Sequence, residues 1–140
     1  MTKAIRIHET GGPEVLRWED VEVGDPGDGE IRVRHTAIGL NYIDTYQRSG
    51  LYPLALPLTL GMEGAGVVEA TGANVSDLKQ GDRVAYASPP PGSYSEARII
   101  GADRVVKVPD GVDDNTAAAM MLQGMTAQYL IRQIHKVSAD

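Results

Sequence analysis

The sequence predicts a mainly β protein that ends in a helical segment. Short stretches of alternating apolar and polar residues recur up to residue 109, and Gly- and Pro-rich turns separate them. Residues 113–136 are instead rich in Ala, Met, Leu and Gln. Alternation with a period of two is typical of half-buried strands, whereas the second composition favours a helix. Many short strands between such turns indicate a small barrel or a sandwich.

The alternating stretches give the expected strands in chain order. The clearest is 30–40, where Ile31 and Val33 face one way while Arg32 and Arg34 face the other. Turn sequences such as DPGDG and SPPPG separate the stretches. The predicted strands are 3–9, 15–25, 30–40, 66–71, 81–87, 93–100 and 103–109.

Two helices and one loop complete the prediction. A short helix is expected over 42–50, ended by Gly50, and a longer one over 113–136. Gly124 costs about 1 kcal/mol inside a helix, so we expect a junction between two helical pieces there. Residues 51–60 contain two prolines, which favours a packed loop.

Composition limits the classes of function. The chain has 140 residues and a net charge of −6, which argues against nucleic acid and anionic membranes as partners. It contains no cysteine, which excludes disulfides, zinc–thiolate clusters and cysteine nucleophiles within it. No apolar run approaches the ~20 residues of a membrane span, and the N-terminus carries no signal-peptide pattern. We therefore expect a cytoplasmic protein.

The stretch GMEGAGVVEATG at 61–72 places one acid, Glu63, among closely spaced glycines. Glycine permits close backbone approach or positive φ, so a carboxylate there is expected to be partly buried. A buried carboxylate needs a charged partner or several donors. A barrel corner with a structural ion pair is one interpretation, and a functional acid is the other.

A second candidate stretch, 38–53, gathers an amide and phenols. Asn41 falls where a strand is expected to end and a helix to begin, so it is either an N-cap extended by Asp44 or a ligand-binding group. Tyr42 and Tyr46 are spaced i, i+4, and Tyr52 follows the turn. Such groups around a loop can stack on and hydrogen-bond a planar polar ligand.

The remaining polar candidates are weaker. Thr126 could donate to a ligand phosphate or ribose, or it could cap a second helical piece. The three histidines, His8, His35 and His135, are dispersed, so surface or packing roles are expected.

Several separated motifs, in order, resemble those of a known superfamily. Gly61-Met62-Glu63 followed by Gly66 and Gly72 resembles the G-H-E-x2-G-x5-G signature of zinc-type alcohol dehydrogenases, with Met62 replacing the His. The segment 39–44 resembles their G-h-C-x-[ST]-D segment with Asn41 replacing the Cys, and 81–84 matches G-D-R-V. The chain is thus similar, end to end, to the front half of medium-chain dehydrogenases/reductases.

The differences from the zinc-type pattern indicate which group of the superfamily the chain resembles. An amide and a thioether stand where the family's catalytic zinc takes a Cys and a His, and together they make a poor zinc site. With GGPEVL at 11–16 and the segment 41–53, the chain resembles the zinc-free quinone oxidoreductases of the zeta-crystallin group.

This resemblance implies a fold and a domain organisation. The expected fold is a mainly β, chaperonin-10-like (GroES-like), partly open barrel with short helices over residues 1–112. Residues 113–140 form a helical segment that leads toward a Rossmann domain outside this sequence. The full-length protein is expected to be a homodimer.

The resemblance also implies an activity and its residues. NADPH, with NADH as the alternative, would reduce a quinone by hydride transfer without zinc, and the isolated chain would be inactive. Asn41 is expected at the nicotinamide end of the cofactor, with Gln123 and Thr126 near the cofactor at the domain boundary. Tyr46 and Tyr52, with Asn41, are the expected catalytic residues lining the quinone pocket. Glu63 and Asp44 resemble acids that support the metal in zinc relatives, and here they would order the loop around Asn41.

Two alternatives remain open at this stage. A free-standing, non-enzymatic GroES-like module is suggested by the apolar helix at 117–134, which would seek a partner if exposed. A related zinc-free enoyl reductase would share the same architecture.

Overall fold

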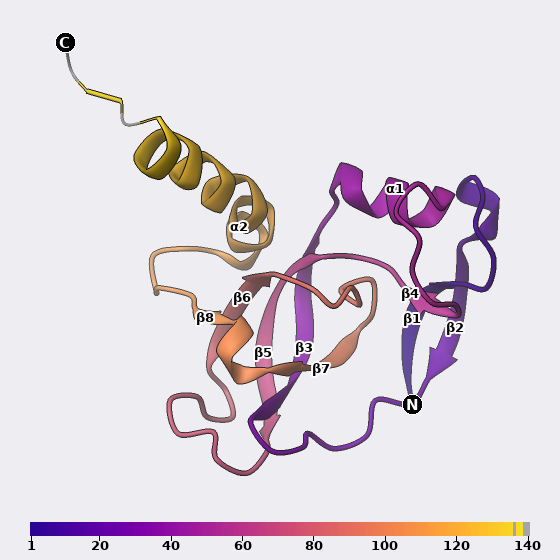
Figure 1. Cartoon of the computed structure of the whole chain (residues 1–140). Coiled ribbons are helices and arrows are strands. Elements are labelled where there is room, and N and C mark those ends of the chain that lie inside the picture. Colours follow the sequence, from indigo (N-terminus) through magenta and orange to yellow (C-terminus); the bar gives the residue numbers. More distant parts are fainter. Residues whose placement is uncertain (136, 139–140) are drawn as a thin grey trace.

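Two antiparallel sheets form the body of the molecule, as Figure 1 shows for the computed structural model, which describes residues 1–135 and 137–138. The first sheet has three strands in the order β2 (Arg17–Val21), β1 (Thr2–Ile7) and β4 (Leu58–Thr59). The second has five, in the order β7 (Ala97–Gly101), β3 (Glu30–Gly39), β5 (Glu63–Thr71), β6 (Arg83–Ala87) and β8 (Val106–Lys107).

The two sheets meet where β1 runs beside the segment that leads into β7. The Ile5 N–H donates to the Tyr94 carbonyl oxygen at 2.7 Å, and the Glu96 N–H donates to the Lys3 carbonyl oxygen at 2.8 Å. One isolated bridge, between Ala4 and Ser95, joins them further. The result is a partly open barrel that does not close, so the mainly β fold predicted from the sequence is confirmed.

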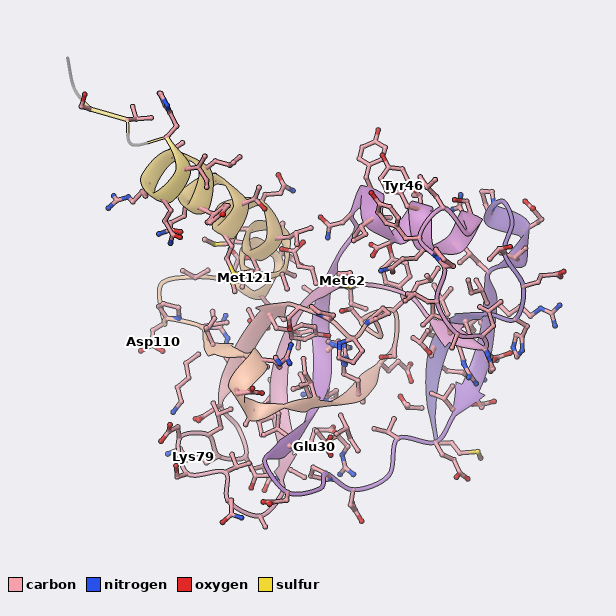
Figure 2. The ribbon with its side chains drawn as sticks, in the orientation of Figure 1. Glu30, Tyr46, Met62, Lys79, Asp110 and Met121 are labelled. Carbon is pink, nitrogen blue, oxygen red and sulfur yellow. The ribbon has the colours of Figure 1, made fainter. Side chains whose placement is uncertain are left out.

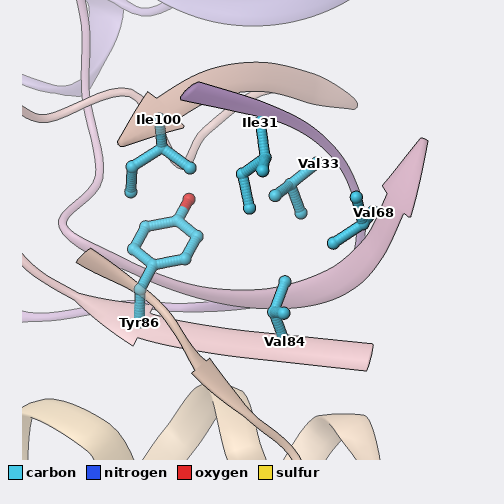
Figure 3. Packing of buried hydrophobic residues seen from close by; sticks show 6 residues of the cluster. All are labelled: Ile31, Val33, Val68, Val84, Tyr86 and Ile100. Carbon is cyan, nitrogen blue, oxygen red and sulfur yellow. The ribbon is translucent and has the colours of Figure 1, made fainter. Parts of the chain in front are cut away.

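The main core lies against the five-stranded sheet. In β3, Ile31 and Val33 are fully buried while Arg34 on the other face is exposed, which is the alternation that the sequence predicts. Burial of each large aliphatic side chain contributes roughly 1.5–3 kcal/mol. Figure 3 shows six residues of the cluster, which are Ile31, Val33, Val68, Val84, Tyr86 and Ile100.

Two helices and three short helical pieces connect and extend the sheets. The helix α1 (Tyr42–Ser49) ends at Gly50, whose φ of 84° is left-handed, as the sequence predicts. The helix α2 (Asp114–Tyr129) runs unbroken through Gly124 and continues into η3 (Leu130–Ile134), a π-helical turn. The predicted junction at Gly124 is therefore wrong, because one glycine costs little beside the cooperative bonds of a long helix. The 3-10 turns are η1 (Pro13–Val15) and η2 (Ala102–Arg104).

Small residues let the start of α2 lie directly on the sheet. Ala117 and Ala118 are buried against Ala65 and Ala85 of β5 and β6. Figure 1 shows α2 beginning beside β6 and then extending away from the strands. None of the helices in the described part of the chain combines the length and the hydropathy needed to cross a membrane.

Some predicted elements differ from those observed. The region 51–60, expected as a loop, contributes the two-residue strand β4. The predicted strand 93–100 is shortened to β7, because residues 93–95 instead form the bridge and turn that join the two sheets.

Candidate active site

Asn41 is fixed where β3 ends and α1 begins. It is the N-cap of α1, and its backbone N–H donates to Asp44 Oδ2 at 2.9 Å. Its side-chain nitrogen Nδ2 donates to Glu63 Oε2 at 2.8 Å, and the residue is only 8% exposed. Asn41 is therefore an N-cap extended by Asp44, which is one of the two interpretations made from the sequence, and its role as a ligand-binding group stays a prediction.

The acid Asp44 supports this corner from inside the molecule. The Tyr94 hydroxyl donates to Asp44 Oδ2 at 2.8 Å. Burial raises the pKa of Asp44, the hydrogen bonds from Asn41 and Tyr94 partly oppose this, and the nearby Glu63 adds to the rise. Burial, followed by the hydrogen bond to Asp44, also raises the pKa of Tyr94. These groups thus form a connected, buried polar support for the start of α1.

Met62 is also engaged within the protein. Its sulfur accepts from Gln47 Nε2 at 3.8 Å, and its side chain is buried. In Figure 2, Met62 lies between α2, which carries Met121, and α1, which carries Tyr46. Gly61 precedes it with φ of 95°, a conformation that favours glycine, and this residue lies tightly against the Tyr94 backbone.

These residues do not fit zinc. An amide nitrogen that already donates to Glu63 and a thioether that accepts from an amide offer none of the thiolate or imidazole donors that zinc prefers. Over residues 1–135 and 137–138, no three His, Cys, Asp or Glu side chains gather as a metal site would require.

Tyr42, Tyr46 and Tyr52 form one exposed aromatic cluster on α1 and the loop after it. The Tyr46 and Tyr52 rings meet edge to face with centroids 5.5 Å apart, and the Tyr42 and Tyr46 centroids are 6.4 Å apart. The exposed fractions are 80% for Tyr42, 37% for Tyr46 and 52% for Tyr52, so ring faces are open to solvent. Such a cluster can stack on a flat ligand and offer it phenol hydroxyls.

Gln123 and Thr126, the two residues of α2 predicted to lie near the cofactor, are exposed. They are connected to Asn41 only indirectly. The Thr126 hydroxyl donates to the Leu122 carbonyl oxygen at 2.8 Å, and Gln123 follows Leu122. The Leu122 N–H donates to Glu63 Oε1 at 2.8 Å, while Glu63 Oε2 accepts from Asn41. The structure thus links Asn41 to α2 through Glu63, a link that sequence reasoning missed because it joins residues 59 positions apart.

A hollow in the described part of the chain lies away from these candidate residues. Its volume is about 790 Å³. Strands β1 and β2 line one side of it, and strands β3 and β7 line the other. Ile5, Trp18, Arg34, Ile38 and Tyr94 are among its lining residues, and the sequence-predicted site residues are not. The sequence-predicted site residues lie instead at the start of α1, along it and after it, and on α2, so the candidate active site is the corner between these two helices.

Comparison with known proteins identifies the family to which the chain belongs. Residues 27–137 match the alcohol dehydrogenase GroES-like domain. The chain is 54% identical over 138 residues to a quinone oxidoreductase of Pseudomonas aeruginosa, and it is 48% identical over 143 residues to a 2-haloacrylate reductase of a Burkholderia species. These alignments cover 98% of the chain in both cases, but only 42% and 43% of the relatives.

A solved structure shows the same relationship in three dimensions. The quinone oxidoreductase of Escherichia coli, in complex with NADPH, superposes with a TM-score of 0.96 at 44% identity. The superposition covers 99% of this chain and 43% of that one. The chain therefore spans less than half the length of these relatives, and its partly open barrel is the GroES-like fold predicted from the sequence. The chain belongs to the alcohol dehydrogenase GroES-like domain family, and its similarity within that family is to quinone oxidoreductases.

Proposed function

We propose that this chain is the catalytic-domain portion of an NADPH-dependent quinone oxidoreductase that works without zinc. One observation carries the proposal: the two positions that resemble zinc-ligand positions hold Asn41 and Met62, and both side chains are committed to contacts within the protein. The sequence around both positions still resembles the zinc-type motifs, whereas the side chains at the zinc-ligand positions themselves differ. The similarity to quinone oxidoreductases, one of them in complex with NADPH, supports the same reaction.

The residues of the corner suit a flat, electron-poor substrate. A quinone is already a good electrophile and needs no Lewis acid. When bound, NADPH would supply a hydride, and a proton from solvent or a phenol completes the two-electron reduction to a hydroquinone. The exposed faces of Tyr46 and Tyr52 would hold the quinone ring, and their hydroxyls or water would polarise its carbonyl. Asn41 would contact the nicotinamide end, and Gln123 and Thr126 would lie along the cofactor.

The packing of α2 supports a proposed division of the chain. Residues 1–112 would form the catalytic domain, and 113–140 the boundary to a nucleotide-binding domain in the rest of the protein. The buried Ala117 and Ala118 attach α2 to the barrel, whereas Met125 and Tyr129 further along are about half exposed. NADPH binding would therefore require the rest of the protein. We further propose a cytoplasmic homodimer, with no membrane or nucleic-acid partner.

The proposal is tested on the full-length enzyme with NADPH and small quinones such as 1,4-benzoquinone. We expect turnover that a strong chelator leaves unchanged and that falls at least tenfold in the Tyr46→Ala and Tyr52→Ala variants. A suitable control is Trp18→Ala, which removes an exposed aromatic side chain on β2, outside the aromatic cluster. Loss of turnover on chelation, followed by recovery with zinc, would overturn the zinc-free mechanism.

A second candidate function is reduction of a conjugated alkene. It is supported by the 48% identity to a 2-haloacrylate reductase, because a haloacrylate carries a carbon–carbon double bond next to a carboxyl group. Assaying 2-chloroacrylate beside benzoquinone separates the two, and a higher kcat/KM for the acrylate would replace the quinone as the proposed substrate.

A further inference from the structure

The Glu63 carboxylate joins both helices of the candidate active site. It stands at the start of β5 and is only 1% exposed. Its Oε2 accepts from Asn41 Nδ2, and its Oε1 accepts from the Leu122 N–H, each at 2.8 Å. No ion pair with a basic side chain is found for it in the described part of the chain. A carboxylate buried in this way depends on these two donors.

The backbone of β3 and α2 packs closely around Glu63. Gly39 pairs with Glu63 across β3 and β5. A Cβ on Gly39 would overlap the Ala118 carbonyl oxygen and would lie 2.5 Å from Glu63 Oε2. The end of β3, the start of β5 and the body of α2 therefore meet with no side chain between them, and the carboxylate lies at their junction.

We propose that Glu63 is a positioning residue that fixes Asn41 and α2 relative to each other, so that both meet the same cofactor. This inference rests on the proposed function. One carboxylate oxygen holds the Asn41 amide with its nitrogen turned toward β5. The other holds α2 at Leu122, the residue before Gln123 and the acceptor for the Thr126 hydroxyl. Glu63 itself touches neither substrate nor cofactor.

The hydrogen bond between Asn41 and Glu63 can be tested with variants that exchange its donor and its acceptor. In Glu63→Gln, the new amide can still accept from Leu122 through its oxygen, but its NH₂ then opposes the NH₂ of Asn41. In Asn41→Asp, two carboxylates face each other in a buried site. The double variant Asn41→Asp/Glu63→Gln exchanges carboxylate and amide, which restores one donor and one acceptor at the contact. Glu69→Gln removes a carboxylate from the same strand that pairs with Arg32 and Arg34 at the surface, and it is the matched control.

The test uses the full-length protein, with NADPH affinity measured by nicotinamide fluorescence. Loss of a hydrogen bond to a charged group corresponds to roughly tenfold or more in affinity. We therefore expect each single variant to raise the Kd for NADPH at least tenfold, and Glu69→Gln to leave the Kd unchanged. The double variant carries the same change at the cofactor as Asn41→Asp, and we expect it to bind NADPH at least threefold more tightly than Asn41→Asp because the contact with residue 63 is restored. A Kd for Glu63→Gln equal to that of the control, or a double variant no better than Asn41→Asp, would overturn the proposal.

A readout without cofactor separates this inference from the proposed function. The side-chain amide protons of Asn41 are identified by NMR as the signals lost in Asn41→Asp. We expect them to exchange slowly with solvent in the wild-type protein and at least tenfold faster in Glu63→Gln. If the wild-type protein binds no NADPH, the proposed function fails, while the exchange rates still show whether Glu63 holds Asn41. Fast exchange in the wild-type protein would overturn the positioning role itself.

Discussion

At the scale of single residues, the barrel interior depends on one neutral imidazole. His35 Nδ1 donates to the Ser95 carbonyl oxygen at 2.7 Å, and Nε2 accepts from the Tyr86 hydroxyl at 2.6 Å. Ser93 Oγ lies 2.9 Å from the same hydroxyl. Burial lowers the pKa of His35 to about 4, the hydrogen bond to Ser95 partly opposes this, and the charge of Arg98 adds to the lowering. A protonated ring could no longer accept from Tyr86.

The first prediction follows from this lowered pKa. The unfolded imidazole takes up a proton near pH 6.5, whereas the folded one stays neutral down to about pH 4. The contribution of His35 to stability is therefore complete above pH 6.5 and is lost as the pH falls from 6.5 to 4. Urea unfolding followed by circular dichroism should show up to ~3 kcal/mol of this loss, about 1.4 kcal/mol per pH unit.

Two variants assign this pH dependence. His35→Gln should flatten the slope between pH 6.5 and 4, although it lowers stability at pH 7 because the buried contacts are disturbed. His8→Gln is the control, since His8 lies near the surface beside Glu19 and not in the core. An unchanged slope in His35→Gln would show that other groups cause the acid sensitivity.

At the scale of elements, one ion pair attaches the start of α2 to the barrel. Arg83 of β6 donates through Nε to Asp114 Oδ1 at 2.9 Å and through Nη2 to the Val112 carbonyl oxygen at 2.6 Å. The Thr36 hydroxyl of β3 donates to Asp114 Oδ2 at 2.6 Å. The hydrogen bond from Thr36, followed by that from Arg83, lowers the pKa of Asp114, because both favour its charged form.

The second prediction concerns this attachment. Arg83→Ala should lower the free energy of unfolding by about 2 kcal/mol, since it removes charge-assisted bonds and leaves the Val112 carbonyl without its donor. Arg104→Ala, which removes an exposed arginine 3.7 Å from Asp103, should change stability by less than ~0.5 kcal/mol. Equal effects in the two variants would contradict the attachment role.

The third prediction compares two glycines at sites of opposite character. Gly39→Ala would drive a methyl group into the Ala118 carbonyl oxygen, so we expect a loss of ~2 kcal/mol or more. Gly124→Ala has open space within α2 and should stabilise the protein by up to ~1 kcal/mol. Thermal unfolding of both variants tests this, and a stabilising Gly39→Ala would show that α2 does not lie as close to β3 as described.

The elements show which parts of the structure a sequence can predict. The helix predicted over 42–50 is observed as Tyr42–Ser49, because its N-cap, its cap partner Asp44 and its terminal Gly50 all lie within a few residues. The sequence predicts Glu63 to be partly buried with a charged partner or several donors, and the structure buries it almost completely, at 1% exposed. Its two donors come from Asn41 and Leu122, which no local pattern links, so the geometry of the site could not be predicted.

At the scale of the whole molecule, the second half of α2 and η3 expose large apolar side chains to solvent. Met125, Tyr129 and Ile134 are 46%, 49% and 62% exposed, although such side chains usually lie inside a protein. An apolar helical surface of this kind is typical of an interface. The relatives are more than twice as long as this chain, since it covers only 42% and 43% of them. We therefore expect the rest of the protein to pack on this surface.

The fourth prediction tests that packing by hydrogen exchange. A helix end without tertiary contacts frays, so the backbone amides of residues 123–134 should exchange rapidly in the isolated chain. In the full-length protein, packing should slow them at least tenfold, whereas the amides of β2, on the far side of the barrel in Figure 1, should exchange equally in both. Equal rates for 123–134 in the two proteins would contradict this packing and would place the contact with the rest of the protein elsewhere. Slowing confined to this segment would place the interface on α2, next to the Leu122 contact that connects it to Asn41.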